Sequence, residues 1–202
     1  MSIMVKNVRC FFPTLDKAEK NPKFPDSPAR YSIQVGIVPG SDNDKAIQAA
    51  IDLAGHDKYK AEWPEVKQEV QFSKQNYCYI NGSKYKDKNG NVRDGYEGLI
   101  ILRAGMTEDR GSPLVLSNKK DPATGRAAVI SDPKEIKRQV YSGCYVNLKA
   151  DIFAFGTSKG IGCGLLTVQF HADGAAFGGA RPDDEGFDAL DDTGDAGFDQ
   201  DL

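Results

Sequence analysis

The strongest alternation of apolar and polar residues lies in YVNLKADIFAF, residues 145–155. Apolar side chains recur there at every second position, which is the period of a strand with one buried face. The inward side chains of this predicted strand are Val146, Leu148, Ala150, Ile152 and Ala154. Its outward face carries Tyr145, Asn147, Lys149, Asp151, Phe153 and Phe155.

Shorter segments with the same alternation, or with a continuous apolar run, predict further strands. They are residues 3–12, 31–37, 77–79, 99–104 and 165–170, together with a hairpin over 113–131. Pro13 is expected to stop the first strand, because proline cannot donate a ladder hydrogen bond. Two Asn-Gly pairs, at 81–82 and 89–90, predict a protruding loop or ribbon after the strand through Tyr77 and Tyr79.

Two segments change to the helical period. In residues 41–54, Ser41 or Asp42 can cap a helix whose apolar stripe includes Ile47 and Ile51, and Gly55 is expected to end it. In residues 132–142, Asp132 is the expected cap, Pro133 occupies the first turn, and Gly143 is expected to end the helix. Both helices are therefore short insertions among strands.

About seven short strands and two helices make the chain mainly β. The elements do not alternate as strand, helix, strand, which argues against a doubly wound sheet. We predict an OB-fold-like Greek-key barrel with an inserted helix and hairpin loops. It would occupy residues 1–180, and residues 181–202 would form a disordered acidic tail because they combine few hydrophobic residues with high charge.

Charge divides the chain in the same place. The 202 residues carry a net charge of −3, but residues 181–202 hold nine acidic side chains and one basic one, a net of −8. The remaining residues hold 25 basic and 20 acidic side chains, a net of +5. A mildly basic body with a strongly acidic tail indicates an anionic partner for the body.

Several kinds of chemistry find little support. The four cysteines are far apart, without a C-x-x-C pair, and only His56 and His171 offer imidazoles, so we predict no metal site. GTSKGIG, residues 156–162, matches the glycine turn of short-chain dehydrogenases, but a strand-like segment follows where a helix is needed. We interpret it as a hairpin connection and predict a protein that has no cofactor and is not an enzyme.

The chain has no run of about eighteen apolar residues, and its N-terminus lacks the pattern of a signal peptide. We therefore expect no membrane association and a location in the cytoplasm.

Basic and aromatic residues share the predicted loops and strands. Cations neutralise phosphates, and aromatic faces stack on unpaired bases at about 1–3 kcal/mol per base, so this combination favours a single-strand groove. The predicted DNA-binding residues are Tyr77, Tyr79, Lys84, Tyr85, Lys86, Lys88, Arg93, Lys119, Lys120, Arg126, Tyr145, Lys149 and Phe153.

The acidic tail carries hydrophobic residues that a simple solubiliser would not need. Acidic residues interleaved with a few apolar anchors are typical of a short recognition peptide. The residues predicted to contact partner proteins are Phe187, Asp188, Leu190, Asp191, Asp192, Phe198, Asp199, Asp201 and Leu202. The same negative charge can also occupy the basic groove until nucleic acid displaces it.

The segment YSGCYVNLKADIFAFGTSKGIGCGLLTVQFHADGAAFGG, residues 141–179, resembles a phage and prophage family of OB-fold single-stranded DNA-binding proteins. GYEGLIILRA and RYSIQVGIVP fit the same pattern, so the resemblance covers roughly residues 3–180. It implies an accessory of replication or recombination that coats exposed single strands, with an acidic C-terminal tail that contacts replication proteins. Such tails typically end in phenylalanine, whereas this chain ends in Leu202.

The sequence thus predicts a single-stranded DNA-binding protein without strong sequence preference. A phage structural or adaptor protein with a solubilising tail is the main alternative, and an enzyme with a nucleotide cofactor at Gly156–Gly162 is a weaker one. The sequence does not separate simple coating of a strand from annealing of two complementary strands.

Overall fold

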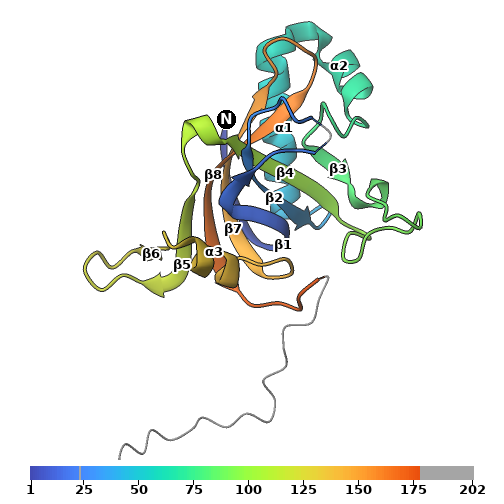
Figure 1. Ribbon diagram of the computed structural model, residues 1–202. Coiled ribbons are helices and arrows are strands. Elements are labelled where there is room, and N and C mark those ends of the chain that lie inside the picture. Colours follow the sequence, from blue (N-terminus) through green and yellow to red (C-terminus); the bar gives the residue numbers. More distant parts are fainter. Residues whose placement is uncertain (23, 178–202) are drawn as a thin grey trace, which may run out of the picture.

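Five strands close into a barrel, which is the central feature of the computed structural model (Figure 1). The structure describes residues 1–22 and 24–177. The chain pairs β1 with β2, β2 with β4, β4 with β8, β8 with β7, and β7 with β1, which completes the circle. All of these pairings are antiparallel except the β4–β8 pair, which is parallel at Gly105 and Gly164. This is the strand arrangement of an OB fold, and the predicted fold class is confirmed.

Within the described residues there are eight strands and three α-helices. The sequence predicted about seven strands and two helices, so the structure has one more of each. The strands are β1 (Ser2–Glu19), β2 (Arg30–Ile37), β3 (Tyr79–Asn81), β4 (Ile100–Thr107), β5 (Leu114–Lys120), β6 (Ala127–Val129), β7 (Tyr145–Ala154) and β8 (Ile161–Ala172). The helices are α1 (Asp42–Tyr59), α2 (Trp63–Val70) and α3 (Pro133–Gln139).

The barrel core follows the alternation in the sequence. Val146, Leu148, Ala150 and Ile152 on β7 are all fully buried, as predicted. The prediction that Pro13 stops the first strand is wrong. β1 continues to Glu19, because its pairing with β2 shifts register between Phe11 and Thr14, and a bulge tolerates a residue without a backbone N–H.

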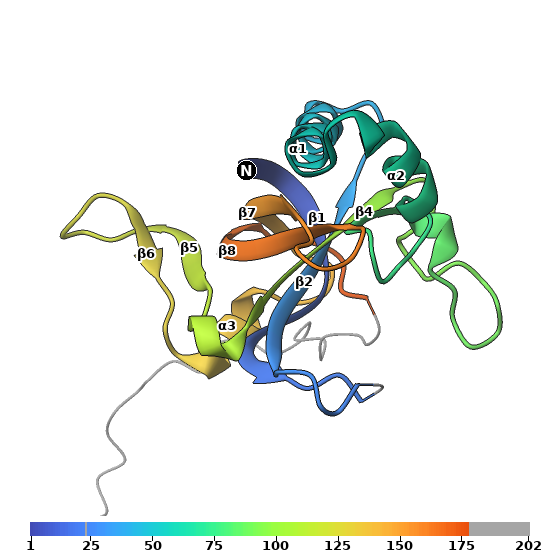
Figure 2. The same cartoon turned by 90° about the horizontal axis from the view of Figure 1, so that it is seen from above.

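A long insertion between β2 and β4 places α1 and α2 against one end of the barrel (Figure 2). Ser41 caps α1, as predicted. The prediction that Gly55 ends this helix is wrong, since α1 runs on to Tyr59. Gly55 is instead a packing position, because a Cβ there would lie 2.2 Å from the Trp63 ring.

A carboxylate ties α1 to the strand that follows the helices. Asp44 accepts hydrogen bonds from the Gly40 N–H at 2.7 Å, from Gln48 at 2.7 Å and from the Tyr79 hydroxyl at 2.8 Å. Burial alone would raise the pKa of Asp44, but these donors outweigh it and hold the pKa below its usual value. The chain then forms a projecting arm, residues 82–99, before it enters β4.

A second insertion, between β4 and β7, forms the β5–β6 hairpin and α3 on the other side of the barrel (Figure 1). β5 extends the sheet by pairing parallel to β8. Asp132 caps α3 and Pro133 begins it, as predicted, although the helix ends at Gln139, before Gly143.

The described residues hold no cluster of His, Cys, Asp and Glu suited to a metal ion. None of the helices among them is long and apolar enough to cross a membrane. The four cysteines are free and buried.

Candidate nucleic-acid interface

A cleft of about 580 Å³ lies on the outer surface of the barrel. One wall is the loop between β1 and β2, which contributes Phe24, and the other is formed by Phe153 and Phe155, where β7 ends. The outer faces of β2 and β4 form the floor. In OB folds, the face of the second and third barrel strands, flanked by the first and last of the four loops, is where oligonucleotides bind.

Small side chains keep the floor of the cleft open. Ser32 on β2 pairs with Gly105 on β4, and the next outward pair is Gln34 with Arg103. Gly105 in turn pairs with Gly164 on β8, so the floor continues as glycine into the next strand. At Ser32 and Gly105 an unpaired base can therefore approach the strand backbone without meeting a bulky side chain.

Aromatic rings stand at both sides of this floor. Phe153 is 40 % exposed and its ring centroid lies 6.1 Å from that of Phe155. Phe24, on the opposite loop, is 51 % exposed. The two rings at the end of β7 lie over Gly162, where a Cβ would come within 2.6 Å of the Phe153 ring and 2.8 Å of the Phe155 ring. Glycine at this position is therefore required for the rings to occupy this place.

Three cations line the cleft: Lys20, Arg30 and Arg103. Arg103 is held in place by hydrogen bonds from its Nη2 to the carbonyl oxygens of Lys74 and, at 2.9 Å, Tyr77. Its buried Nε has no partner among the described residues. Arg30 and Lys20 are exposed, so they are free to follow a phosphate backbone.

The inserted helices support the wall formed by the β7–β8 loop. The Gly160 N–H donates to the Tyr59 hydroxyl at 3.0 Å, and Lys159 forms an ion pair with Glu69 at 2.7 Å. The loop is the hairpin connection predicted for GTSKGIG, because β8 follows it directly. The strand–turn–helix context of a dinucleotide site is therefore missing.

Two buried thiols, those of Cys78 and Cys163, line the same cleft. Burial raises the pKa of Cys78 to about 12, and it also raises the pKa of Cys163. Both side chains are therefore protonated near neutral pH, and neither is a thiolate nucleophile.

The structure places the predicted residues in several different regions. Phe153 and Tyr77 line the cleft. Tyr77, Tyr79 and Tyr85 are only 6 %, 6 % and 7 % exposed, so the expectation of three open stacking rings is wrong for this conformation. Tyr79 lies under α1 with its hydroxyl on Asp44, and burial raises the pKa of Tyr79 above its usual value. The insertion of α1 covers the strand face that the sequence suggested was open.

Four predicted cations lie on the arm: Lys84, Lys86, Lys88 and Arg93, all exposed. The Lys84 Nζ lies 5.8 Å from the centroid of the Phe72 ring. Arg93 lies over the ring of Phe12 at 5.5 Å. Two cations of the arm therefore lie over the rings of Phe72 and Phe12, and neither ring lines the cleft.

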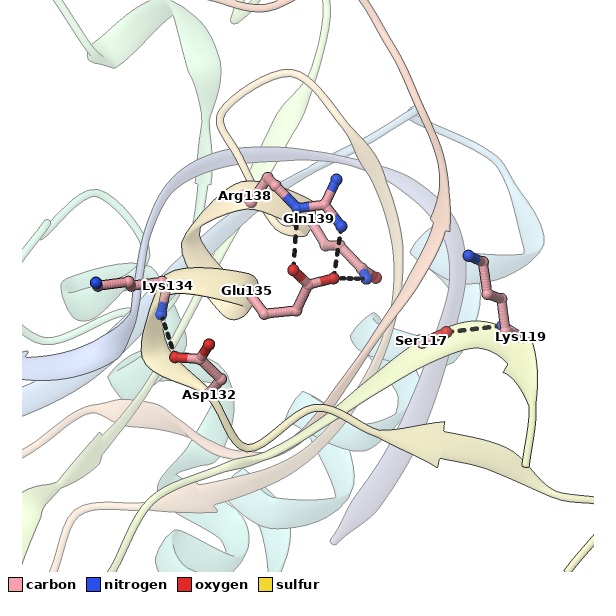
Figure 3. Close-up of polar contacts among 7 residues, drawn as sticks. All are labelled: Ser117, Lys119, Asp132, Lys134, Glu135, Arg138 and Gln139. Carbon is pink, nitrogen blue, oxygen red and sulfur yellow. Dashed lines mark hydrogen bonds and ion pairs between the residues drawn. The ribbon is translucent and has the colours of Figure 1, made fainter. Parts of the chain in front are cut away.

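Lys119, Lys120 and Arg126 lie on the β5–β6 hairpin, which faces α3 (Figure 3). Lys134 and Lys137 of α3 are exposed as well, and we call these five cations together the α3–hairpin surface. The carboxylates in the same area are locally bonded. Asp132 caps α3, and Glu135 accepts from Arg138 at 3.0 and 2.6 Å. Arg138 is the main reason that the pKa of Glu135 falls to about 2, with a further contribution from Lys119.

The last two predicted residues lie on the outer face of β7. Lys149 is exposed, whereas Tyr145 is partly covered by the Arg9 guanidinium, 5.6 Å from its ring centroid. The predicted tail contacts lie outside the described residues. They are Phe187, Asp188, Leu190, Asp191, Asp192, Phe198, Asp199, Asp201 and Leu202.

The sequence reasoning missed five residues of the cleft: Lys20, Phe24, Arg30, Arg103 and Phe155. Phe155 lies on the outward face predicted for residues 145–155, so the alternation in the sequence already indicated that its side chain points away from the core. Phe24 lies in a proline-rich loop with no periodicity, and only the fold shows that this loop is opposite the end of β7.

A family model described as the single-stranded DNA-binding protein of Enterobacter phage Enc34 matches residues 1–197. The chain belongs to this family. A curated relative, the p50 protein of Acyrthosiphon pisum secondary endosymbiont phage 1, is 33 % identical over 107 residues. This match spans 52 % of the chain and 51 % of the relative's length, which is about half of each protein.

Solved structures share the fold. The single-stranded DNA-binding protein of bacteriophage Enc34 in complex with single-stranded DNA aligns with a TM-score of 0.64 and 24 % identity, over 88 % of this chain and 89 % of that one. The gp2.5 single-stranded DNA-binding protein of bacteriophage T7 aligns with a TM-score of 0.50 and 12 % identity, over 94 % and 99 % of the two chains. At these identities the alignments establish the shared fold and leave individual DNA contacts to the geometry of this chain.

Proposed function

We propose that this protein binds single-stranded DNA in the cleft, without strong sequence preference. The observation that carries the proposal is the combination of rings and cations around a small-residue floor, at the oligonucleotide-binding face of an OB fold. Membership of a phage single-stranded DNA-binding family supports it independently.

The cleft favours unpaired bases over a duplex. Phe24 and Phe153 offer ring faces on which any base can stack, whereas the bases of a duplex are already stacked on one another. Lys20 and Arg30 neutralise phosphates without reading base edges. The arm, the α3–hairpin surface and Lys149 supply further cations for a strand that extends beyond the cleft.

The biological role that fits this activity is non-catalytic. The protein would coat single strands exposed during phage replication or recombination, and its acidic tail would contact proteins of those processes. The tail's net charge of −8 would also compete with DNA for the basic body.

A titration of fluorescent oligo-dT tests the proposal, with anisotropy read at two salt concentrations and a matching duplex as competitor. We expect tight binding for which the duplex competes poorly. The logarithm of the affinity should fall with the logarithm of salt concentration, with a slope of about −0.7 per phosphate contacted. Absence of binding at low salt would overturn the proposal and favour a structural or adaptor role.

Deletion of residues 181–202 tests the role of the tail. The truncated chain should bind oligo-dT more tightly, most clearly at low salt, where charge competition is least screened. Unchanged or weaker binding would show that the tail does not compete with DNA. It would not bear on DNA binding in the cleft, which the titration tests separately.

A further inference from the structure

Phe72, directly after α2, is 69 % exposed, more than any other large apolar side chain in the described chain. It lies outside the cleft lining and outside the barrel core. Because an isolated exposed phenylalanine does not stabilise the fold by burial, its surroundings decide what it is suited to contact.

One lysine lies over this ring, and a second lies over the ring of Tyr85, the residue that follows Lys84 on the arm. The Lys84 Nζ lies 5.8 Å from the Phe72 ring centroid, and the Lys74 Nζ lies 4.9 Å from that of Tyr85. Neither lysine takes part in an ion pair among the described residues. On the same arm, the Asp87 carboxylate accepts from the backbone N–H groups of Asn89 and Asn91. Phe72 therefore lies beside one cation, Lys84, whose charge is not neutralised by an ion pair among the described residues.

The segment that carries Phe72 leads directly into the cleft. Gln75 and Tyr77, a few residues further along, both line it. Arg103, on the cleft floor, donates hydrogen bonds to the carbonyl oxygens of Lys74 and Tyr77. Consecutive Cα atoms are about 3.8 Å apart, so Phe72 lies within a few residue lengths of the cleft edge.

We propose that Phe72 and Lys84 form a second base-stacking station, which holds a nucleotide of the strand that leaves the cleft beside Gln75. This inference rests on the proposed function and extends it. The ring offers a face to one unpaired base, and Lys74 and Lys84 contact the adjoining phosphates. An exposed ring beside a cation without an ion pair fits a stacked nucleotide better than it fits an apolar peptide, which would leave the Lys84 ammonium without an anionic partner.

A length series of oligo-dT, from about 4 to about 16 nucleotides, tests the station with the full chain. Phe72→Ala should weaken binding of the longer oligonucleotides about 5- to 150-fold, the loss expected for one stacked base, and leave the shortest unaffected. Phe72→Tyr should bind like the wild type, because it retains a ring. Leu53→Ala, another exposed apolar truncation outside the cleft, serves as the matched control.

Either of two results would overturn the station: Phe72→Ala binding every length like the wild type, or binding every length more weakly by the same factor. If the wild-type chain bound no oligonucleotide at all, the proposed function itself would fail, and the two failures are thus distinguishable.

Fluorescence supplies a direct readout of stacking. Trp63 is the only tryptophan and is buried, so Phe72→Trp adds a single exposed reporter. Its emission, corrected for that of the wild type, should be quenched by a long oligo-dT and not by the shortest one. Unchanged emission at saturation with the long oligonucleotide would contradict the proposal.

Discussion

The cleft and the α3–hairpin surface lie on different parts of the barrel and differ in composition. The cleft combines the rings of Phe24, Phe153 and Phe155 with three cations, one of which is fixed by carbonyl groups. The α3–hairpin surface has five cations without ion pairs among the described residues, yet residues 114–139 contain no aromatic side chain. Under the proposed function, the first region suits unpaired bases and the second suits negative charge alone.

This difference separates two contributions to binding. Stacking on rings is nearly independent of salt, whereas contacts between lysine and phosphate release counterions and weaken as salt rises. Variants in the two regions should therefore change different measured quantities, affinity in one and salt dependence in the other.

The largest effect is expected from removal of both exposed rings of the cleft. Phe24→Ala combined with Phe153→Ala should cost about 2–6 kcal/mol of binding free energy to oligo-dT, at about 1–3 kcal/mol per stacked base. The salt slope should stay unchanged, because every cation is retained. Anisotropy titrations at several salt concentrations measure both. A much shallower slope in this variant would erase the distinction between the two regions.

A smaller effect is expected at the support of the cleft wall. Tyr59→Phe removes the hydroxyl that accepts from the Gly160 N–H, and this should weaken oligo-dT binding by roughly 1 kcal/mol through a less ordered β7–β8 loop. Hydrogen exchange at Gly160 should increase in parallel. Faster exchange with unaltered affinity would mean that the loop does not need this support to bind DNA.

A change mainly in salt dependence is expected at the hairpin. Lys119→Gln combined with Lys120→Gln should reduce the magnitude of the salt slope by about 0.7 for each phosphate that a lysine no longer neutralises, equally for different base compositions. A slope identical to that of the wild type would show that DNA does not reach the hairpin. In that case the surface would remain available to the acidic tail or to a protein partner.

The smallest effect concerns the Glu135–Arg138 pair on α3. Hydrogen bonds from Arg138 and, to a lesser extent, Gln139 lower the pKa of Glu135 from 4.5 to about 2, so the ionised carboxylate stabilises the fold above about pH 4.5. That contribution should disappear as the pH falls toward 2. The difference in melting temperature between wild type and Glu135→Gln, followed from pH 7 to 2, should accordingly shrink on acidification. A difference that grows in acid would contradict the assignment.

Sequence patterns predicted the barrel better than they predicted the cleft. The alternation in β7 identified every buried residue of that strand because period two directly reports which face is covered. Tyr79 shows the limit of the same reasoning. Its strand lies beneath α1, and the burial of its outward face depends on a helix packed by long-range contacts that no local pattern contains.

The cleft depends even more on contacts distant in sequence. Phe24 and Phe153 line one site although about 130 residues separate them, and only the closure of the barrel brings their segments together. Phe72 carried no signal for the same reason, since its cation comes from the arm. Pro13 does not end its strand, because a bulge accommodates it. Gly55 does not end its helix, because glycine is needed there for close packing against Trp63.

Photo-crosslinking tests most directly where DNA bases lie on the protein. An oligo-dT that carries photoreactive bases would be bound by the full chain, irradiated and mapped by mass spectrometry. The account predicts adducts on Phe24, Phe153 or Phe155, and their disappearance when excess unlabelled oligo-dT is added. Adducts confined to residues 114–139, with none in the cleft, would contradict it.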